Sequence, residues 1–188
     1  MGAGTNVVIV MHRRAFLTLA GAAALGVTVA RAEAAYYEGA EYVYYDTWEA
    51  PGTIIINTGE RWLYHILGDG EATRYGVAVG KDGFQWAGIA KVGRKVEWPK
   101  WTPPSSMIKR RPELAEYANG MPGGPDNPLG ARALYLFEGG RDTLFRIHGT
   151  NEPQSIRKAA SSGCIRMLNE EVVQLYDMVP IGTKVIVL

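Results

Sequence analysis

The strongest constraint on the fold is a series of short apolar segments, each separated from the next by turn-forming residues. Residues 53–57 and 61–67 are rich in β-branched and aromatic side chains, and an Asn-Thr-Gly-Glu turn lies between them. This pattern predicts a β-hairpin. A third run at residues 72–79 follows a Gly-Asp-Gly-Glu turn and predicts another strand.

The C-terminal part repeats this pattern and adds one helix. Residues 133–138 and 143–148 predict two strands joined by a Gly-Gly-Arg-Asp turn, and residues 184–188 predict a closing strand. Residues 170–178 predict a helix with Asn169 as its N-cap and two glutamates in its first turn. Many short strands and one or two short helices predict a mainly β fold, an antiparallel β-sandwich or barrel.

Residues 80–130 hold most of the prolines of the chain. They predict one further strand at 84–92, a short helical turn at 112–117 and otherwise a long loop. Long loops inside compact domains are usually functional or disordered. We therefore expect this segment to form a lid or wall over a groove.

The N-terminal 34 residues have the composition of an export signal. Arg13 and Arg14 precede an Ala, Gly, Leu and Val run over residues 15–30, and small residues follow. This arrangement is typical of a twin-arginine signal cleaved after Ala32 or Ala34. A single membrane anchor is the alternative, but the run is shorter than the roughly 20 strongly apolar residues that a span requires.

The predicted organisation is therefore an export signal at 1–34, a Tyr-rich lead-in at 35–52 and one domain at 53–188. We expect a periplasmic or cell-envelope protein with no stable membrane span after cleavage. Removal of residues 1–34 takes away three arginines and one glutamate, which changes the formal net charge from +1 to −1. A near-neutral domain does not predict a nucleic-acid partner.

The chain contains one cysteine, Cys164, and three histidines. A single cysteine cannot form an internal disulfide, so Cys164 is either a buried apolar residue or a free thiol kept for chemistry. It follows a Ser-Ser-Gly turn and precedes Arg166, which is a poor sequence for a core segment. His148 ends a predicted strand, and a histidine with a lone cysteine is typical of a thiol nucleophile and its base.

Two features of this motif favour carbonyl chemistry. The backbone N–H groups of Gly163 and Cys164 can face a developing oxyanion. Arg166 should point to the same side as Cys164, where it would bind a substrate carboxylate or form a surface ion pair. No Asp or Asn stands out to orient His148, so a backbone carbonyl is the candidate. Dispersed histidines and one cysteine predict no metal site, and we expect no cofactor.

Two motifs resemble the signature of the L,D-transpeptidase catalytic domain family of the YkuD type: His-Gly-Thr at 148–150 and Ser-Ser-Gly-Cys-Ile-Arg at 161–166. The resemblance extends over residues 53–188. Many family members have His where this chain has Ser162. The Thr-Pro-Pro sequence at 102–104 lacks the Gly that usually follows in the family.

The resemblance implies a periplasmic enzyme that acts on the peptide stems of peptidoglycan. Cys164 would attack the carbonyl that joins a diamino acid to the terminal D-alanine, and His148 would protonate the leaving group. The Gly149 carbonyl would orient His148. The acyl group would then pass to the side-chain amine of a second stem. The donor site would be lined by Ser161, Ser162 and Arg166.

Three alternatives remain open from the sequence. The same acyl-enzyme would react with water in an L,D-carboxypeptidase, or with an amine of an outer-membrane protein or a free D-amino acid. A non-catalytic wall-binding domain would keep Cys164 packed and inert. A redox-sensing thiol would need a resolving cysteine, which the chain lacks.

Overall fold

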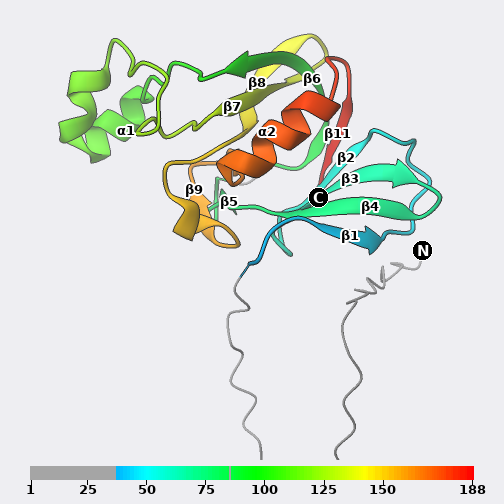
Figure 1. Ribbon diagram of the computed structural model, residues 1–188. Helices are drawn as coiled ribbons and strands as arrows, with labels where there is room; N and C mark the ends of the chain where they lie inside the picture. Colours follow the sequence, from blue (N-terminus) through cyan, green and yellow to red (C-terminus); the bar gives the residue numbers. More distant parts are fainter. Residues whose placement is uncertain (1–36, 85) are drawn as a thin grey trace, which may run out of the picture.

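One nine-stranded sheet carries most of the chain. The computed structural model describes residues 37–84 and 86–188 (Figure 1). The strand order is β1-β4-β3-β2-β11-β6-β7-β8-β10, and a separate two-stranded sheet joins β5 to β9. Two neighbouring pairs, β2–β11 and β8–β10, are parallel and the other pairs in the large sheet are antiparallel. The predicted mainly β fold is confirmed. The predicted export signal lies outside the described residues.

The first half of the sheet contains the predicted hairpin. Its strands are β1 (Glu41–Tyr44), β2 (Ile54–Asn57), β3 (Trp62–Gly68) and β4 (Glu71–Gly76), and the short β5 (Val79–Gly80) of the two-stranded sheet follows them. The Tyr-rich lead-in thus supplies the edge strand β1. The strand predicted at 72–79 is divided, because the chain leaves the large sheet after β4 and Ala78 forms a bridge with Arg166.

The second half contains the strands that carry the motif. They are β6 (Gly88–Glu97), β7 (Arg132–Glu138), β8 (Arg141–His148), β10 (Ile165–Arg166) and β11 (Lys184–Val187), and β9 (Ala159–Ser161) lies between β8 and β10 in the chain but pairs with β5. The bridge between Ala78 and Arg166 ties β10 back to the segment that follows β4. The two halves of the sheet therefore meet beside the motif.

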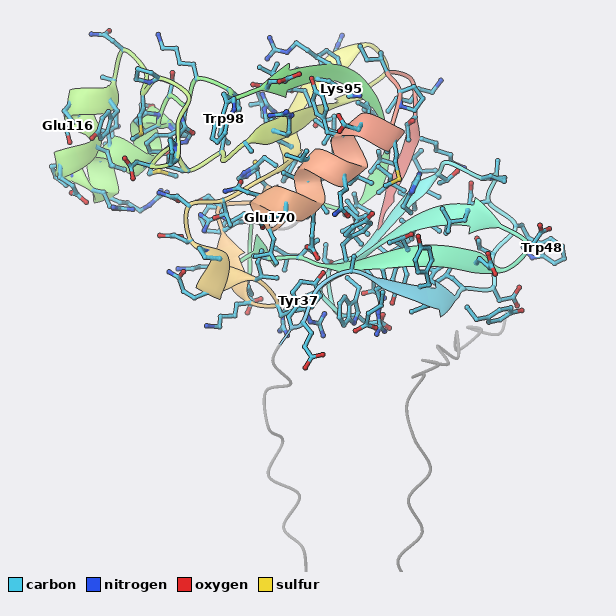
Figure 2. All side chains as sticks on the ribbon, viewed as in Figure 1. Tyr37, Trp48, Lys95, Trp98, Glu116 and Glu170 are labelled. Atoms are coloured by element: carbon cyan, nitrogen blue, oxygen red, sulfur yellow. The ribbon has the colours of Figure 1, made fainter. Side chains whose placement is uncertain are left out.

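The segment between β6 and β7 is more ordered than a long loop. Strand β6 runs to Glu97 rather than ending at residue 92, because its exposed basic residues belong to the solvent face of a strand. Helix α1 (Ser105–Arg110) and the 3₁₀ helix η1 (Pro112–Tyr117) follow, and η1 confirms the predicted helical turn. Figure 2 shows Trp98 and Glu116 in this segment at one end of the molecule, with Trp48 at the other.

Helix α2 (Asn169–Met178) packs against β7 and β8 and covers the main core (Figure 1). Its buried Val172 and Leu175 meet apolar residues of both halves of the sheet. A short 3₁₀ helix, η2 (Pro153–Ser155), lies in the loop between the two motifs. Within residues 37–84 and 86–188, neither α-helix has the length and apolar content needed to cross a membrane.

Asn169 is not the N-cap that the sequence predicts. The helix begins at Asn169, Leu168 occupies the N-cap position, and no side chain caps the helix. The two glutamates do lie in its first turn. The Asn169 amide points instead toward the chain around His148, where it bonds to Ala131 and Thr150.

Candidate active site

Strands β8 and β10 bring His148 and Cys164 onto neighbouring parts of the sheet. In this parallel pair, Ile165 lies opposite Ile147 and Arg166 lies opposite His148. Cys164 directly precedes β10, so it lies level with Arg146 and diagonally from His148. Diagonal neighbours in a sheet have Cα atoms roughly 7–8 Å apart, which side chains can span.

His148 is buried, with 4% of its surface exposed. Its Nδ1 lies 2.6 Å from the carbonyl oxygen of Gly149. This contact favours the neutral tautomer in which Nδ1–H donates to that carbonyl and Nε2 keeps its lone pair. Burial, assisted by the positive charge of Arg166, lowers the pKa of His148 to about 4. The ring is therefore neutral near pH 7 and able to accept a proton.

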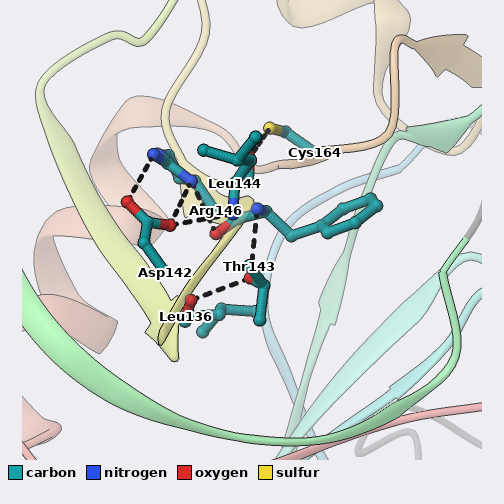
Figure 3. A network of polar contacts seen from close by, with 7 residues as sticks. Leu136, Asp142, Thr143, Leu144, Arg146 and Cys164 are labelled. Carbon is teal, nitrogen blue, oxygen red and sulfur yellow. Dashed lines mark hydrogen bonds and ion pairs between the residues drawn. The ribbon is translucent and has the colours of Figure 1, made fainter. Parts of the chain in front are cut away.

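Cys164 is half-buried, and its Sγ lies 3.9 Å from the carbonyl oxygen of Leu144 (Figure 3). Burial raises the pKa of the thiol, while the Arg146 backbone and the charges of Arg146 and Arg166 act in the opposite direction. Among the described residues, the thiol's hydrogen bond goes to Leu144 rather than to His148. The resting sulfur is therefore a thiol whose hydrogen bond goes to the Leu144 carbonyl.

The turn before Cys164 is closed by Ser161. Its hydroxyl donates to the carbonyl oxygen of Cys164 at 2.6 Å and accepts from the Gly163 N–H at 3.1 Å. The expected oxyanion role of the Gly163 N–H is thus not available in this conformation, because Ser161 occupies that donor. Ser161 is buried and bonded within its own turn, whereas Ser162 is exposed.

Gly163 is required by its backbone and its surroundings. Its φ is +123°, which L side chains rarely adopt, and a Cβ there would lie 2.8 Å from Cε1 of Phe145 and 3.0 Å from the carbonyl oxygen of Phe84. The backbone at this glycine therefore approaches an aromatic ring and a neighbouring loop closely. Contacts this short explain why no side chain fits at the position.

Arg166 forms an ion pair with Glu152 of the intervening loop, at 2.6 Å between Nη1 and Oε2. Of the two readings that the sequence leaves open, the structure thus contains the ion pair. The backbone of Glu152 is held in place because its N–H donates to Oγ1 of Thr150 at 3.0 Å. A substrate carboxylate would have to share Arg166 with Glu152 or displace it.

A second guanidinium lies beside the sulfur and was missed by sequence reasoning. Arg146 forms an ion pair with Asp142 at 3.0 Å, and its Cζ lies 4.4 Å from the centroid of the Tyr135 ring (Figure 3). An arginine within a strand carries no motif of its own. The indicator available in the sequence was its position two residues before His148, on the same face of β8.

A cleft of about 500 Å³ lies next to this turn. Its aromatic part is formed by Trp86 and Phe145, whose rings stack with centroids 5.4 Å apart. Its polar part contains Glu138, Arg141 and Asp142. The Phe145 ring also packs against Gly163. Phe145 therefore lines the cleft and also packs against the turn that precedes Cys164.

The described residues contain no group of three or more His, Cys, Asp or Glu side chains arranged to hold a metal ion. His65, the other described histidine, is buried at 7% exposure within β3, and burial lowers its pKa. It lies on β3, which is separated from β8 by four strands of the large sheet.

The fold is that of known L,D-transpeptidases. The crystal structure titled "L,D-transpeptidase from Mycobacterium smegmatis" is 17% identical, with a TM-score of 0.55 over 79% of this chain and 67% of that one. The model of the L,D-transpeptidase catalytic domain, YkuD, matches residues 51–187. The chain belongs to this family.

Two curated relatives come from Escherichia coli K12. "Probable L,D-transpeptidase ErfK/SrfK" is 36% identical over 141 residues, and "Probable L,D-transpeptidase YbiS" is 37% identical over 138 residues. Each match covers 70% of this chain but only 42% and 43% of the respective relative. A crystal structure from Brucella melitensis is 49% identical, with a TM-score of 0.55 over 79% of this chain and 92% of that one; its title is "Probable carnitine operon oxidoreductase caia".

Proposed function

We propose that this chain is an L,D-transpeptidase of the cell envelope that uses Cys164 as its nucleophile and His148 as its base. The donor is a tetrapeptide stem of peptidoglycan. The observation that supports the proposal is that a neutral, oriented imidazole ends β8 while the only cysteine directly precedes the neighbouring strand β10, in a chain of this family.

In the first step, the thiol turns from Leu144 to His148 and transfers its proton to Nε2. The sulfur attacks the carbonyl carbon that joins the diamino acid to the terminal D-alanine. The C–N bond breaks, and D-alanine leaves with the proton that His148 returns. A thioester between Cys164 and the stem remains.

In the second step, the side-chain amine of an acceptor stem attacks the thioester. His148 takes a proton from the amine and returns it to the sulfur, so the free thiol is regenerated. The product is an amide between two stems. Arg166 and Ser162 are the proposed donor contacts, and the hydrogen bond from Ser161 to the Cys164 carbonyl supports a role for Ser161 in shaping the turn before the sulfur.

The proposal is tested by incubating the purified protein with sacculi whose stems are tetrapeptides and analysing the released muropeptides by mass spectrometry. New dimers joined through their diamino acids are expected with the wild type and are expected to be absent with Cys164→Ala. Monomers that lack D-alanine, without dimers, would assign hydrolysis instead. Unchanged muropeptides with folded wild-type protein would contradict the proposal.

Location and acceptor choice are part of the same proposal. The composition of residues 1–34 supports export, and a protein amine in the outer membrane is the second candidate acceptor. Cell fractionation with N-terminal sequencing of the product tests export. An intact N-terminus in the cytoplasmic fraction would contradict it.

A further inference from the structure

The Asn169 side chain reaches from the first residue of α2 to the chain on both sides of the His-Gly-Thr motif. Its Oδ1 accepts from the N–H of Ala131 at 3.0 Å and from the N–H of Thr150 at 3.2 Å. Its Nδ2 donates to the carbonyl oxygen of Thr150 at 3.0 Å. All three bonds join a side chain to backbone, so one amide fixes two separate segments.

Two glycines make room for this amide. A Cβ at Gly149 would lie 2.1 Å from Asn169 Oδ1, and a Cβ at Gly130 would lie 2.2 Å from the same atom. Backbone packed this closely around a side-chain oxygen leaves little space for another arrangement. The glycine of the His-Gly-Thr motif is thus explained by the amide that lies against it.

The bond to Thr150 has a direct effect on His148. The carbonyl of Gly149 and the N–H of Thr150 belong to one planar, trans peptide unit, so they point in opposite directions. Asn169 holds the N–H end of this unit, and the His148 ring lies at the carbonyl end, 2.6 Å from the oxygen. Fixing one end therefore sets the direction of the other, and a donated N–H also makes the carbonyl a stronger acceptor.

We propose that Asn169 is a positioning residue for His148: it holds the Gly149–Thr150 peptide so that the Gly149 carbonyl keeps His148 in the Nδ1–H tautomer. Nε2 then has its lone pair available for the thiol proton. In the other tautomer Nε2 carries a hydrogen and cannot accept. The catalytic part of this inference rests on the proposed function, whereas the effect on the tautomer does not.

The tautomer is measured by NMR of the full chain labelled with ¹⁵N-histidine at pH 7. Three histidines give signals, and His148→Gln identifies those of His148. The wild type is expected to show the Nδ1–H form. Asn169→Ala is expected to show a mixture of both tautomers, and Asn169→Asp is expected to restore the Nδ1–H form because it keeps an acceptor for the Thr150 N–H.

Thiol reactivity gives a second readout, because the chain has no other cysteine. Alkylation of Cys164 by iodoacetamide at pH 7 is expected to slow about 10-fold to 100-fold in Asn169→Ala, the scale of a misplaced reacting group. Asn57→Ala is the matched control. Asn57 is also half-buried and accepts from the Glu60 N–H at 2.9 Å, but in the β2–β3 turn. It should leave both readouts unchanged.

Circular dichroism establishes that each variant is folded. If Asn169→Ala unfolds, Asn169→Leu replaces it, since leucine has a similar shape without polar atoms. A wild-type tautomer in the folded variant would overturn the inference. The two proposals can fail separately. If Asn169→Ala shifts the tautomer while the wild-type protein leaves muropeptides unchanged, the positioning role is supported and only the proposed function is contradicted.

Discussion

The carbonyl oxygen of Leu144 lies 3.9 Å from the sulfur of Cys164, and Leu144 itself has a left-handed backbone with φ of +65°. This strained residue sits at a register shift between β7 and β8. The side chains of the two preceding residues stabilise this backbone: Asp142 accepts from the Leu144 N–H at 2.8 Å, and Thr143 accepts from the Phe145 N–H at 3.1 Å. The irregular backbone thus gives the resting thiol its acceptor.

Leu144→Gly should relieve this strain. The Leu144 side chain is exposed, so little packing is lost, and glycine adopts positive φ without a steric penalty. We expect the free energy of unfolding to stay the same or rise by up to about 1 kcal/mol. The control is Ile89→Gly in β6, which is also exposed but pairs in regular register with Ile186 and should lose about 0.5–1 kcal/mol. Equal losses in the two urea titrations would show that Leu144 is unstrained.

The pH dependence of acylation should reflect the buried imidazole. Because the pKa of His148 is lowered to about 4, the rate should fall only when the pH approaches 4, well below the usual range of histidine. Arg166→Gln removes a positive charge that disfavours ring protonation, so the low-pH limb of kcat/KM should move to higher pH. Arg110→Gln removes the same charge from exposed α1 and should leave the limb in place.

An NMR titration of His148 provides the same information without substrate. In the unfolded chain the ring titrates near 6.5, so protons stabilise the unfolded state as the pH falls from about 6.5 toward 4. Stability should therefore decrease over this interval. A low-pH limb of kcat/KM near pH 6.5 would contradict the lowered pKa of His148. A limb that Arg166→Gln does not shift would contradict the charge of Arg166 as one of its causes.

Ser161 and Ser162 should differ in their effects although they are adjacent. Ser161→Ala removes two hydrogen bonds inside a buried turn and should lower the free energy of unfolding by about 1–2 kcal/mol. It should also slow the alkylation of Cys164. Ser162→Ala changes an exposed side chain and should alter stability by less than about 0.5 kcal/mol. Similar melting temperatures for Ser161→Ala and Ser162→Ala would contradict the structural role of Ser161.

Glu171→Gln should stabilise the protein at alkaline pH. Glu171 is buried at 5% exposure in α2, Tyr37 donates a hydrogen bond to its Oε1, and burial raises the pKa of the carboxyl to about 7. The folded state therefore loses stability as the pH rises from about 4.5 through 7. Glutamine keeps an acceptor for Tyr37 without a charge, so the gain at pH 8 should be up to about 3 kcal/mol.

The same substitution should have little effect at pH 4.5, where the carboxyl is already protonated in the fold. Melting temperatures at both pH values test this. Glu170→Gln is the control, because Glu170 is the neighbouring glutamate but is exposed. A stabilisation by Glu171→Gln that does not depend on pH would contradict the assigned ionisation.

The elements that could be predicted from the sequence are those with local signals. The β2–β3 hairpin, the β7–β8 hairpin and α2 were predicted because alternation, turn residues and apolar spacing lie within a few residues. The sequence predicts the next strand at residues 84–92, whereas β6 runs from Gly88 to Glu97. Its basic, solvent-facing residues resemble those of a loop. The parallel pairs β2–β11 and β8–β10 join distant segments and carry no local signal.

The site was predictable in its residue types and less so in its contacts. His148 and Cys164 stand out because each residue type is rare in this chain. Glu152 could not be predicted as the partner of Arg166, because a loop residue gains its partner only when the chain folds back. Asn169 was misassigned for a related reason: asparagine before a helix is the usual N-cap signal, and the sequence does not show which backbone its amide meets.

The strand that carries Arg166 is two residues long, and its place depends on the short ladder to β8 and the bridge to Ala78. Because this strand is held by few hydrogen bonds, it can fray without global unfolding of the domain. On heating, catalytic capacity should therefore vanish before the sheet melts. A covalently attached stem would fasten this corner of the molecule, so the acylated enzyme should resist thermal inactivation better than the free one.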